Sequence, residues 1–184
     1  MYLLIIANAV GHEVQKALRP LDAPPGARAK RRFEELLKRK IAEHSVQFIG
    51  EEAEFGSETI AQRLGLPWAN IDMPETERAA RGISAEQSRR APIPRYLGDD
   101  ARTQLTEEGY QRIVRDGWVE LEPRLKSDEV REEYMLQRTM DEAGDAESIL
   151  VICGIVHSEE LAERFRDRPE TKVEVQVWES EGTK

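Results

Sequence analysis

The sequence has very little cysteine, with Cys153 as the single residue of this type among 184. One cysteine excludes a disulfide bond within the chain and a paired-cysteine metal or redox site, which fits a reducing compartment. The sequence also lacks an apolar run of membrane-spanning length and a basic region before its short apolar N-terminus. We therefore predict a cytoplasmic protein without a membrane partner.

Positive charge is in the minority, because 27 lysines and arginines face 36 acidic residues and the net charge is -9. An acidic surface repels nucleic-acid phosphates, so no nucleic-acid partner is expected. A glycine-rich phosphate loop and a serine nucleophile elbow are both missing. These absences disfavour nucleotide-phosphate enzymes of the P-loop type and serine hydrolases of the α/β-hydrolase type.

The apolar residues form clusters with the spacing of strands and helices. Continuous or alternating runs predict strands at 2–7, 46–49, 68–71, 148–153 and 172–178. Helical spacing predicts helices at 28–44, 106–118 and 127–143, with a proline-rich loop at 19–26. Capping residues predict one helix with Ser57 as its N-cap and Gly65 as its stop, and another with Ser158 as its N-cap. This alternation predicts an α/β fold, with a mostly parallel sheet of about five strands and helices on both faces.

The domain organisation is predicted to be simple. Residues 1–178 form a single α/β domain, and residues 179–184 form a polar tail. Residues 73–126 differ in being rich in arginine and proline, and we expect a helical and loop insertion that covers the strand ends like a lid. The last strand, 172–178, alternates valine with polar residues and is expected at the edge of the sheet.

Polar residues follow several predicted strands. His12 comes after the first strand, Glu51 and Glu52 after the second, Asp72 at the end of the third and His157 after the fourth. Ligands of open α/β sheets bind beyond the carboxyl ends of the strands, so these residues are expected to converge. Imidazoles and carboxylates at one edge suit Zn²⁺ or Mn²⁺, or a general acid and base.

The alternative is that strand-end loops are polar without having a function, and for Glu13 and Glu54 we prefer that interpretation. For Glu51 and Glu52 we favour function, because a carboxylate directly after a buried strand is costly unless a positive group meets it. The sequence does not decide which of the two points inward. Cys153 is interpreted as a core thiol.

A C-terminal pattern carries a family resemblance. Arg131 and Met135 are four residues apart on a predicted helix, and the apolar strand 149–153 then runs into Gly154-x-x-His157. This pattern resembles the C-terminal half of the TraB/TIKI and erythromycin esterase/ChaN-like superfamily. The resemblance implies a histidine after the first strand and a glutamate after the second. It implies a hydrolase in some branches, either a peptidase or an esterase, and haem binding in the ChaN-like branch.

These observations lead to a hypothesis of a small metal-assisted hydrolase that acts on a peptide or small-molecule substrate. His157, His12 and Glu51 or Glu52 would ligate Mn²⁺ or Zn²⁺, and the other glutamate would be the general base. Arg131 would stabilise negative charge in the crevice. In the alternative interpretation Arg131 is exposed and pairs with a surface carboxylate such as Glu133.

Two other functions stay open. The first is a non-catalytic module that binds a small ligand or haem in the same crevice. The second is a metal-dependent nuclease, which the net charge disfavours although the stretch around Arg89, Arg90 and Arg95 is basic. The oligomeric state is also open, with a homodimer as one alternative.

Overall fold

The structure is a computed structural model that describes residues 1–8, 24–52, 56–83 and 127–178. The loop that carries His12, the predicted helix at 106–118 and the polar tail lie outside these residues. The chain divides into two compact units, each described here by itself. The first consists of Met1–Asp72 and Glu133–Lys184, and the second consists of Met73–Glu132.

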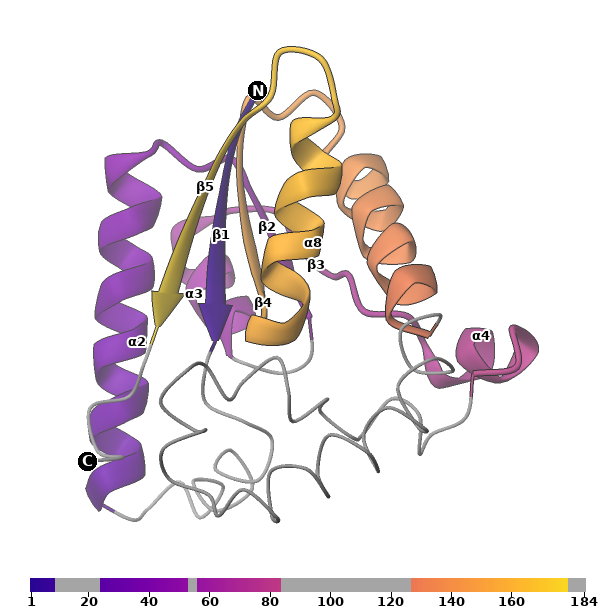
Figure 1. Ribbon diagram of the computed structural model, residues 1–184. Helices are drawn as coiled ribbons and strands as arrows, with labels where there is room; N and C mark the ends of the chain where they lie inside the picture. The colour runs from indigo at the N-terminus through magenta and orange to yellow at the C-terminus, as the bar shows by residue number, and fades with distance from the viewer. Residues whose placement is uncertain (9–23, 53–55, 84–126, 179–184) are drawn as a thin grey trace, which may run out of the picture. The chain divides into compact units, whose positions relative to one another are not determined.

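The first unit contains one sheet of five parallel strands, so the predicted α/β fold is confirmed (Figure 1). The strands are β1 (Tyr2–Asn8), β2 (Phe48–Glu51), β3 (Trp68–Asn70), β4 (Ser148–Gly154) and β5 (Lys172–Trp178). Their order across the sheet is β3-β2-β4-β1-β5. β4 therefore lies between β1 and β2, although it comes last but one in the sequence.

The two central strands are buried on both faces. Residues 3–7 of β1 and 149–153 of β4 all have 0% exposure, as expected for apolar strands covered by helices on both sides. β5 lies at the edge of the sheet, as its sequence predicts, and its burial alternates over 172–175 but not over 176–178, where Gln176 is half-buried and Val177 is exposed. Strands that are continuously apolar thus occupy the middle, and the alternating strand occupies the edge.

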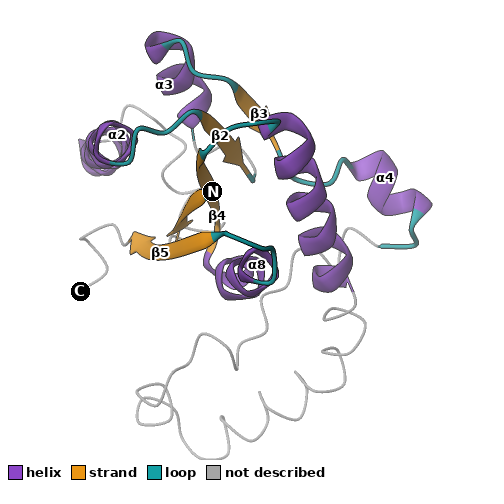
Figure 2. Ribbon diagram, turned by 90° about the horizontal axis from the view of Figure 1, so that it is seen from above, coloured by secondary structure: helices purple, strands orange, loops and turns teal. Residues whose placement is uncertain are grey.

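Helices cover both faces of this sheet (Figure 2). On the α2–α3 face, helices α2 (Pro24–Glu43) and α3 (Ser57–Leu64) pack against even-numbered residues of β1 such as Leu4 and Ile6. On the opposite face, which we call the α8 face, α8 (Ile155–Arg166) and the helical residues 133–143 pack against odd-numbered residues such as Leu3 and Ile5. The two hydrophobic layers follow directly from the alternation of side chains along a strand.

Helix α2 begins earlier than the sequence predicts. Residues 24–26 were expected to belong to a proline-rich loop, but Pro24 and Pro25 open the helix. Proline is tolerated there because the first-turn N–H groups of a helix have no helical acceptor. The predicted apolar stripe is confirmed and consists of Phe33, Leu36, Leu37 and Ile41, all buried.

The start of α3 also differs from the prediction, which made Ser57 its N-cap. The N-cap is Gly56, and Ser57 is the first helical residue. The hydroxyl of Ser57 is engaged elsewhere, since it donates to the Glu51 carboxylate. The predicted end is confirmed, because Gly65 caps the C-terminus with a φ of 67°, a conformation that glycine adopts without strain.

Helix α8 follows β4 without an intervening loop. Gly154 is its N-cap, with φ -61° and ψ 146°, and the helix begins at Ile155. The sequence predicted a loop that ended in a cap at Ser158, and this prediction is wrong because Ser158 lies inside the helix and is 2% exposed. His157 is consequently a buried residue of the first helical turn, at 2% exposure, and not a loop residue.

The described part of the second unit contains α4 (Glu75–Ala80). The Arg81 guanidinium pairs with Glu77 at 2.8 Å, and the Nε of Arg78 donates to the carbonyl oxygen of Met73 at 2.8 Å. The predicted insertion at 73–126 therefore contains a helix, α4. Among the residues that the structure describes, no helix is long and apolar enough to cross a membrane.

Candidate functional site

Glu52 and His157 lie together at the carboxyl ends of β2 and β4. The Nε2 atom of His157 is 3.5 Å from Oε1 of Glu52, and their side chains are 3% and 8% exposed respectively. The other carboxylate oxygen of Glu52 accepts the backbone N–H of Gly154 at 2.8 Å. The carboxylate is therefore held by the turn that starts α8 and faces the imidazole in the first turn of that helix.

The strand register accounts for this meeting. β2 and β4 are parallel neighbours, with Glu51 beside Ile152, and the backbone N–H of Glu52 donates to the carbonyl oxygen of Ile152 at 2.8 Å. Glu52 is thus hydrogen-bonded to β4 two residues before Gly154. His157 lies three residues after Gly154, in the first turn of α8.

Glu51 points to the opposite face, because successive side chains of a strand alternate. Its carboxylate accepts the backbone N–H of Ser57 at 3.1 Å and the indole N–H of Trp68 at 2.9 Å, as well as the hydroxyl of Ser57. Glu51 is 1% exposed. Burial raises the pKa of Glu51, and these donors partly offset the rise.

These contacts make the carboxyl group of Glu51 the cap of α3. The helix has no side-chain cap of its own at Gly56, and its N-terminal N–H groups need an acceptor. A carboxylate at a helix N-terminus also interacts favourably with the helix dipole. The sequence did not decide which of the two glutamates points towards the predicted site. In the structure Glu52 lies beside His157, whereas Glu51 caps α3.

The Glu52–His157 arrangement has a definite chemical capacity. A carboxylate next to an imidazole fixes the orientation of the ring and stabilises its protonated form. Low exposure strengthens such an interaction, because water screens it less. The arrangement suits proton transfer to and from a reacting group, and it also suits holding a cation.

The described residues bring only part of the predicted metal set together. Within the described ranges, no group of three or more histidine, cysteine, aspartate or glutamate side chains is placed to hold a metal ion. Glu52 and His157 amount to two donors, whereas catalytic zinc sites usually take three protein ligands. Glu51 lies on the other face, and His12 is outside the described residues.

Arg131 belongs to the second unit, and we describe it on its own. It lies in the helical residues 127–143, one turn before Met135, which is fully buried in the hydrophobic layer of the α8 face. Arg131 is 5% exposed, so the alternative interpretation, an exposed arginine paired with Glu133 or another surface carboxylate, is wrong. Glu133 pairs with Arg164 instead, at 3.2 Å.

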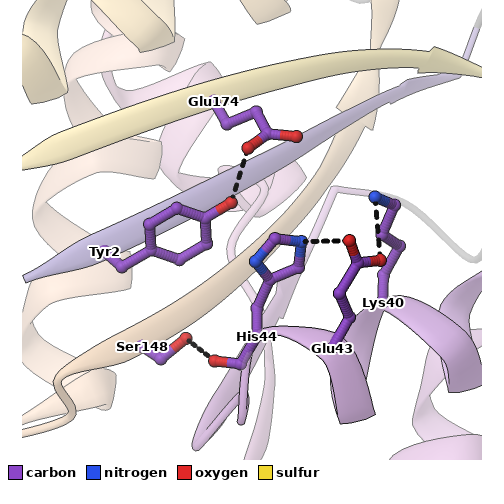
Figure 3. Close-up of polar contacts among 6 residues, drawn as sticks. All are labelled: Tyr2, Lys40, Glu43, His44, Ser148 and Glu174. Atoms are coloured by element: carbon purple, nitrogen blue, oxygen red, sulfur yellow. Dashed lines mark hydrogen bonds and ion pairs between the residues drawn. The ribbon is translucent and has the colours of Figure 1, made fainter.

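A polar cluster at the amino ends of the strands was not anticipated from the sequence (Figure 3). The Tyr2 hydroxyl donates to Glu174 at 2.8 Å, and the ring of Tyr2 stacks on His44 at a centroid distance of 4.8 Å. Burial and the adjacent Glu174 carboxylate raise the pKa of Tyr2. The carbonyl oxygen of His44 accepts the Ser148 hydroxyl at 2.8 Å. The cluster joins the end of α2 to three strands, which is a structural role.

No pattern in the sequence identifies the hydrogen-bond partners of Glu51 and Glu52. Trp68 and Ser57 are 17 and 6 residues from Glu51, and Gly154 is 102 residues from Glu52. Their contacts follow from the strand order, which local patterns do not encode. Searches of protein-family models, curated proteins and solved structures found no significant match to the chain.

Proposed function

We propose that Glu52 and His157 form the acid–base pair of a small hydrolase. The observation that carries this proposal is the 3.5 Å approach of the two side chains at the carboxyl ends of neighbouring parallel strands. Ligands of open α/β sheets bind at this end. The resemblance of the Gly154-x-x-His157 segment to hydrolases of the TraB/TIKI and erythromycin esterase/ChaN-like superfamily points to the same class of reaction.

The cost of burying the pair supports a functional role. Taking a carboxylate out of water costs several kcal/mol, and a hydrophobic pair of similar volume often stabilises a fold as well or better. A buried carboxylate–imidazole pair is therefore weak as a stabilising device. Its placement at a ligand-binding edge gives a reason for keeping it there.

Each residue of the pair has a distinct role in the proposal. His157 takes a proton from the attacking water and returns it to the leaving group. Glu52, anchored by the N–H of Gly154, orients the ring and stabilises the imidazolium that forms. General acid–base catalysis of this kind contributes about 10²–10⁴-fold to the rate. The substrate class is a peptide or a small-molecule ester.

A divalent metal such as Mn²⁺ or Zn²⁺ would extend this proposal, with Glu52 and His157 contributing two donors. A bound metal supplies a water whose pKa is lowered towards neutrality. Glu51 has no part in such a set, because its oxygens accept bonds from Ser57 and Trp68. Haem binding at the same edge is the non-catalytic alternative.

The test compares the wild type with His157→Gln and with His44→Gln, a matched control. His44 lies at the amino ends of the strands and packs on Tyr2. Hydrolysis of nitrophenyl esters and of a quenched-fluorescence peptide set is measured with EDTA, with Mn²⁺ and with Zn²⁺. Circular dichroism verifies that each variant is folded.

We expect the wild type and His44→Gln to hydrolyse at least one substrate, and His157→Gln to lose at least about 10²-fold in kcat/KM. Equal rates for all three proteins would refute the proposal. Absence of hydrolysis combined with metal or haem binding that His157→Gln abolishes would favour the binding module. Activity that survives EDTA would limit the proposal to the acid–base pair without metal.

A further inference from the structure

The outer edge of β5 has the properties of a pairing surface. Within the described ranges β5 is hydrogen-bonded only to β1, so its other side is an open strand edge. The strand is seven residues long and contains neither proline nor glycine. Proteins usually protect edge strands by making them short or by placing charged side chains, proline or bulges there. Of these devices β5 has only the charges of Lys172 and Glu174.

The direction of the backbone groups of β5 can be established from one bond. The N–H of Lys172 donates to the carbonyl oxygen of Met1 at 3.0 Å, so the backbone groups of Lys172 face β1. Backbone groups alternate sides along a strand, so those of Val173, Val175 and Val177 face away from β1. Three N–H and C=O sets therefore point outward along this edge.

The side chains at these outward positions are apolar. Val173 and Val175 are half-buried and pack against the hydrophobic layer of the α8 face, while Val177 is 47% exposed. Outward backbone groups combined with an apolar stripe favour addition of another strand over contact with water. The question is then which strand is complementary to this one.

We propose that the occupant is β5 of a second copy of the chain, paired antiparallel about a two-fold axis at Val175. In this register Val175 lies opposite its own copy, and Val173 lies opposite Val177. All of these residues point their backbone groups at the partner strand, so each pair exchanges two hydrogen bonds. The three valines of each strand also meet on one face.

The other face of the pairing is complementary as well. Glu174 lies opposite Gln176, whose amide is a hydrogen-bond donor. Lys172 lies opposite Trp178, where an ammonium and an indole ring attract each other. Opposite-sign or neutral neighbours across strands are stabilising, whereas like charges directly opposite are destabilising.

Other registers are less favourable. A two-fold axis at Glu174 places two carboxylates opposite each other, and it loses one of the outward pairs. An axis at Gln176 or Val173 matches fewer of the outward valines within β5. The register centred on Val175 therefore has the largest number of backbone bonds and no opposed like charges. This pairing uses no residue of the Glu52–His157 site, so it is independent of the proposed function.

Cysteine cross-linking tests the register directly. Residues opposite each other in a hydrogen-bonded antiparallel pair have Cα atoms about 5.5 Å apart, within the range of a disulfide bond. Val175→Cys should therefore form a covalent dimer on mild oxidation. Val173→Cys is the matched control, because two copies of residue 173 would be four positions apart, or roughly 14 Å. The native Cys153 is buried and should not cross-link in the wild type.

Sedimentation equilibrium across a concentration series completes the test. We expect the wild type to dimerise and Val175→Pro to stay monomeric at every concentration. Proline removes an N–H that faces away from β1, so the bonds between β5 and β1 are retained. A wild type that is monomeric throughout would overturn the proposal. Cross-linking of Val173→Cys as efficient as that of Val175→Cys would also overturn it, even if Val175→Pro failed to fold.

Discussion

Replacement of Glu51 by alanine should destabilise the fold strongly, because the carboxylate is the acceptor for several buried donors. The variant removes the acceptor of the Ser57 N–H, the Ser57 hydroxyl and the Trp68 indole N–H. A buried donor without a partner costs about 1–3 kcal/mol. Trp68 keeps a second acceptor, since its indole also donates to Ser57 Oγ at 3.0 Å.

The expected loss is therefore dominated by the two donors of Ser57. We expect Glu51→Ala to lower the free energy of unfolding by about 2–4 kcal/mol, including the cavity left by the side chain. Glu51→Gln keeps one acceptor oxygen and should cost less than about 1.5 kcal/mol. Urea denaturation followed by circular dichroism measures both values. A loss below about 1 kcal/mol for Glu51→Ala would refute the capping role of Glu51.

The pH dependence of the free energy of unfolding is a second test of the role of Glu51. The pKa of Glu51 is raised in the folded chain by burial, so the folded chain holds its proton to a higher pH than the unfolded chain. Stability from this group is present below the ordinary pKa of a glutamate. It is lost as pH rises through the raised value. Glu51→Gln should remove this component, and an unchanged pH profile would contradict the assignment.

Three further perturbations have expected outcomes. Gly50→Ala should cost about 1–3 kcal/mol in urea denaturation, because a Cβ there would lie 3.0 Å from the Ile71 side chain. His157→Ala should cost about 3 kcal/mol in the same assay, since it leaves the buried Glu52 carboxylate without its imidazole. A cost below about 1 kcal/mol in either variant would contradict the packing described here. In a spectrophotometric titration, Tyr2→Phe should keep the phenolate absorbance that develops where an ordinary tyrosine ionises, because burial and Glu174 raise the pKa of Tyr2. A loss of absorbance within that ordinary range would show that the pKa of Tyr2 is not raised.

The elements that the sequence predicts well are those determined by local pattern. The continuous apolar runs at 2–7 and 148–153 identify the two central strands, and the valine alternation at 172–178 identifies the edge strand. Gly65 identifies the end of α3, because glycine adopts the left-handed conformation of a helix C-cap. Each of these signals lies within a few residues of the element that it predicts.

The features that the sequence does not predict depend on contacts between distant segments. Insertion of β4 between β1 and β2 brings Gly154 to Glu52, and no local pattern encodes this strand order. The helix starts at Pro24 and Ile155 were missed for two reasons: three prolines at 19–26 were interpreted as a loop although proline suits the first helical turn, and Ser158 was interpreted as an N-cap.

The two adjacent glutamates show the limit of sequence analysis most clearly. Glu51 and Glu52 have the same side chain and both follow the apolar run that predicts a strand at 46–49, so composition and spacing treat them alike. Their roles differ because a shift of one residue along a strand reverses the face. The assignment required the strand register and the position of α3.

The comparison of Glu52→Gln with Glu51→Gln is the most direct test of the proposed hydrolase. Glutamine at 52 can keep the bond from the Gly154 N–H while removing the negative charge beside His157. We measure kcat/KM for the best substrate of the wild type. The proposal predicts a loss of about 10²-fold or more for Glu52→Gln and less than about threefold for Glu51→Gln. Equal activity of the two variants, or a larger loss for Glu51→Gln, would contradict it.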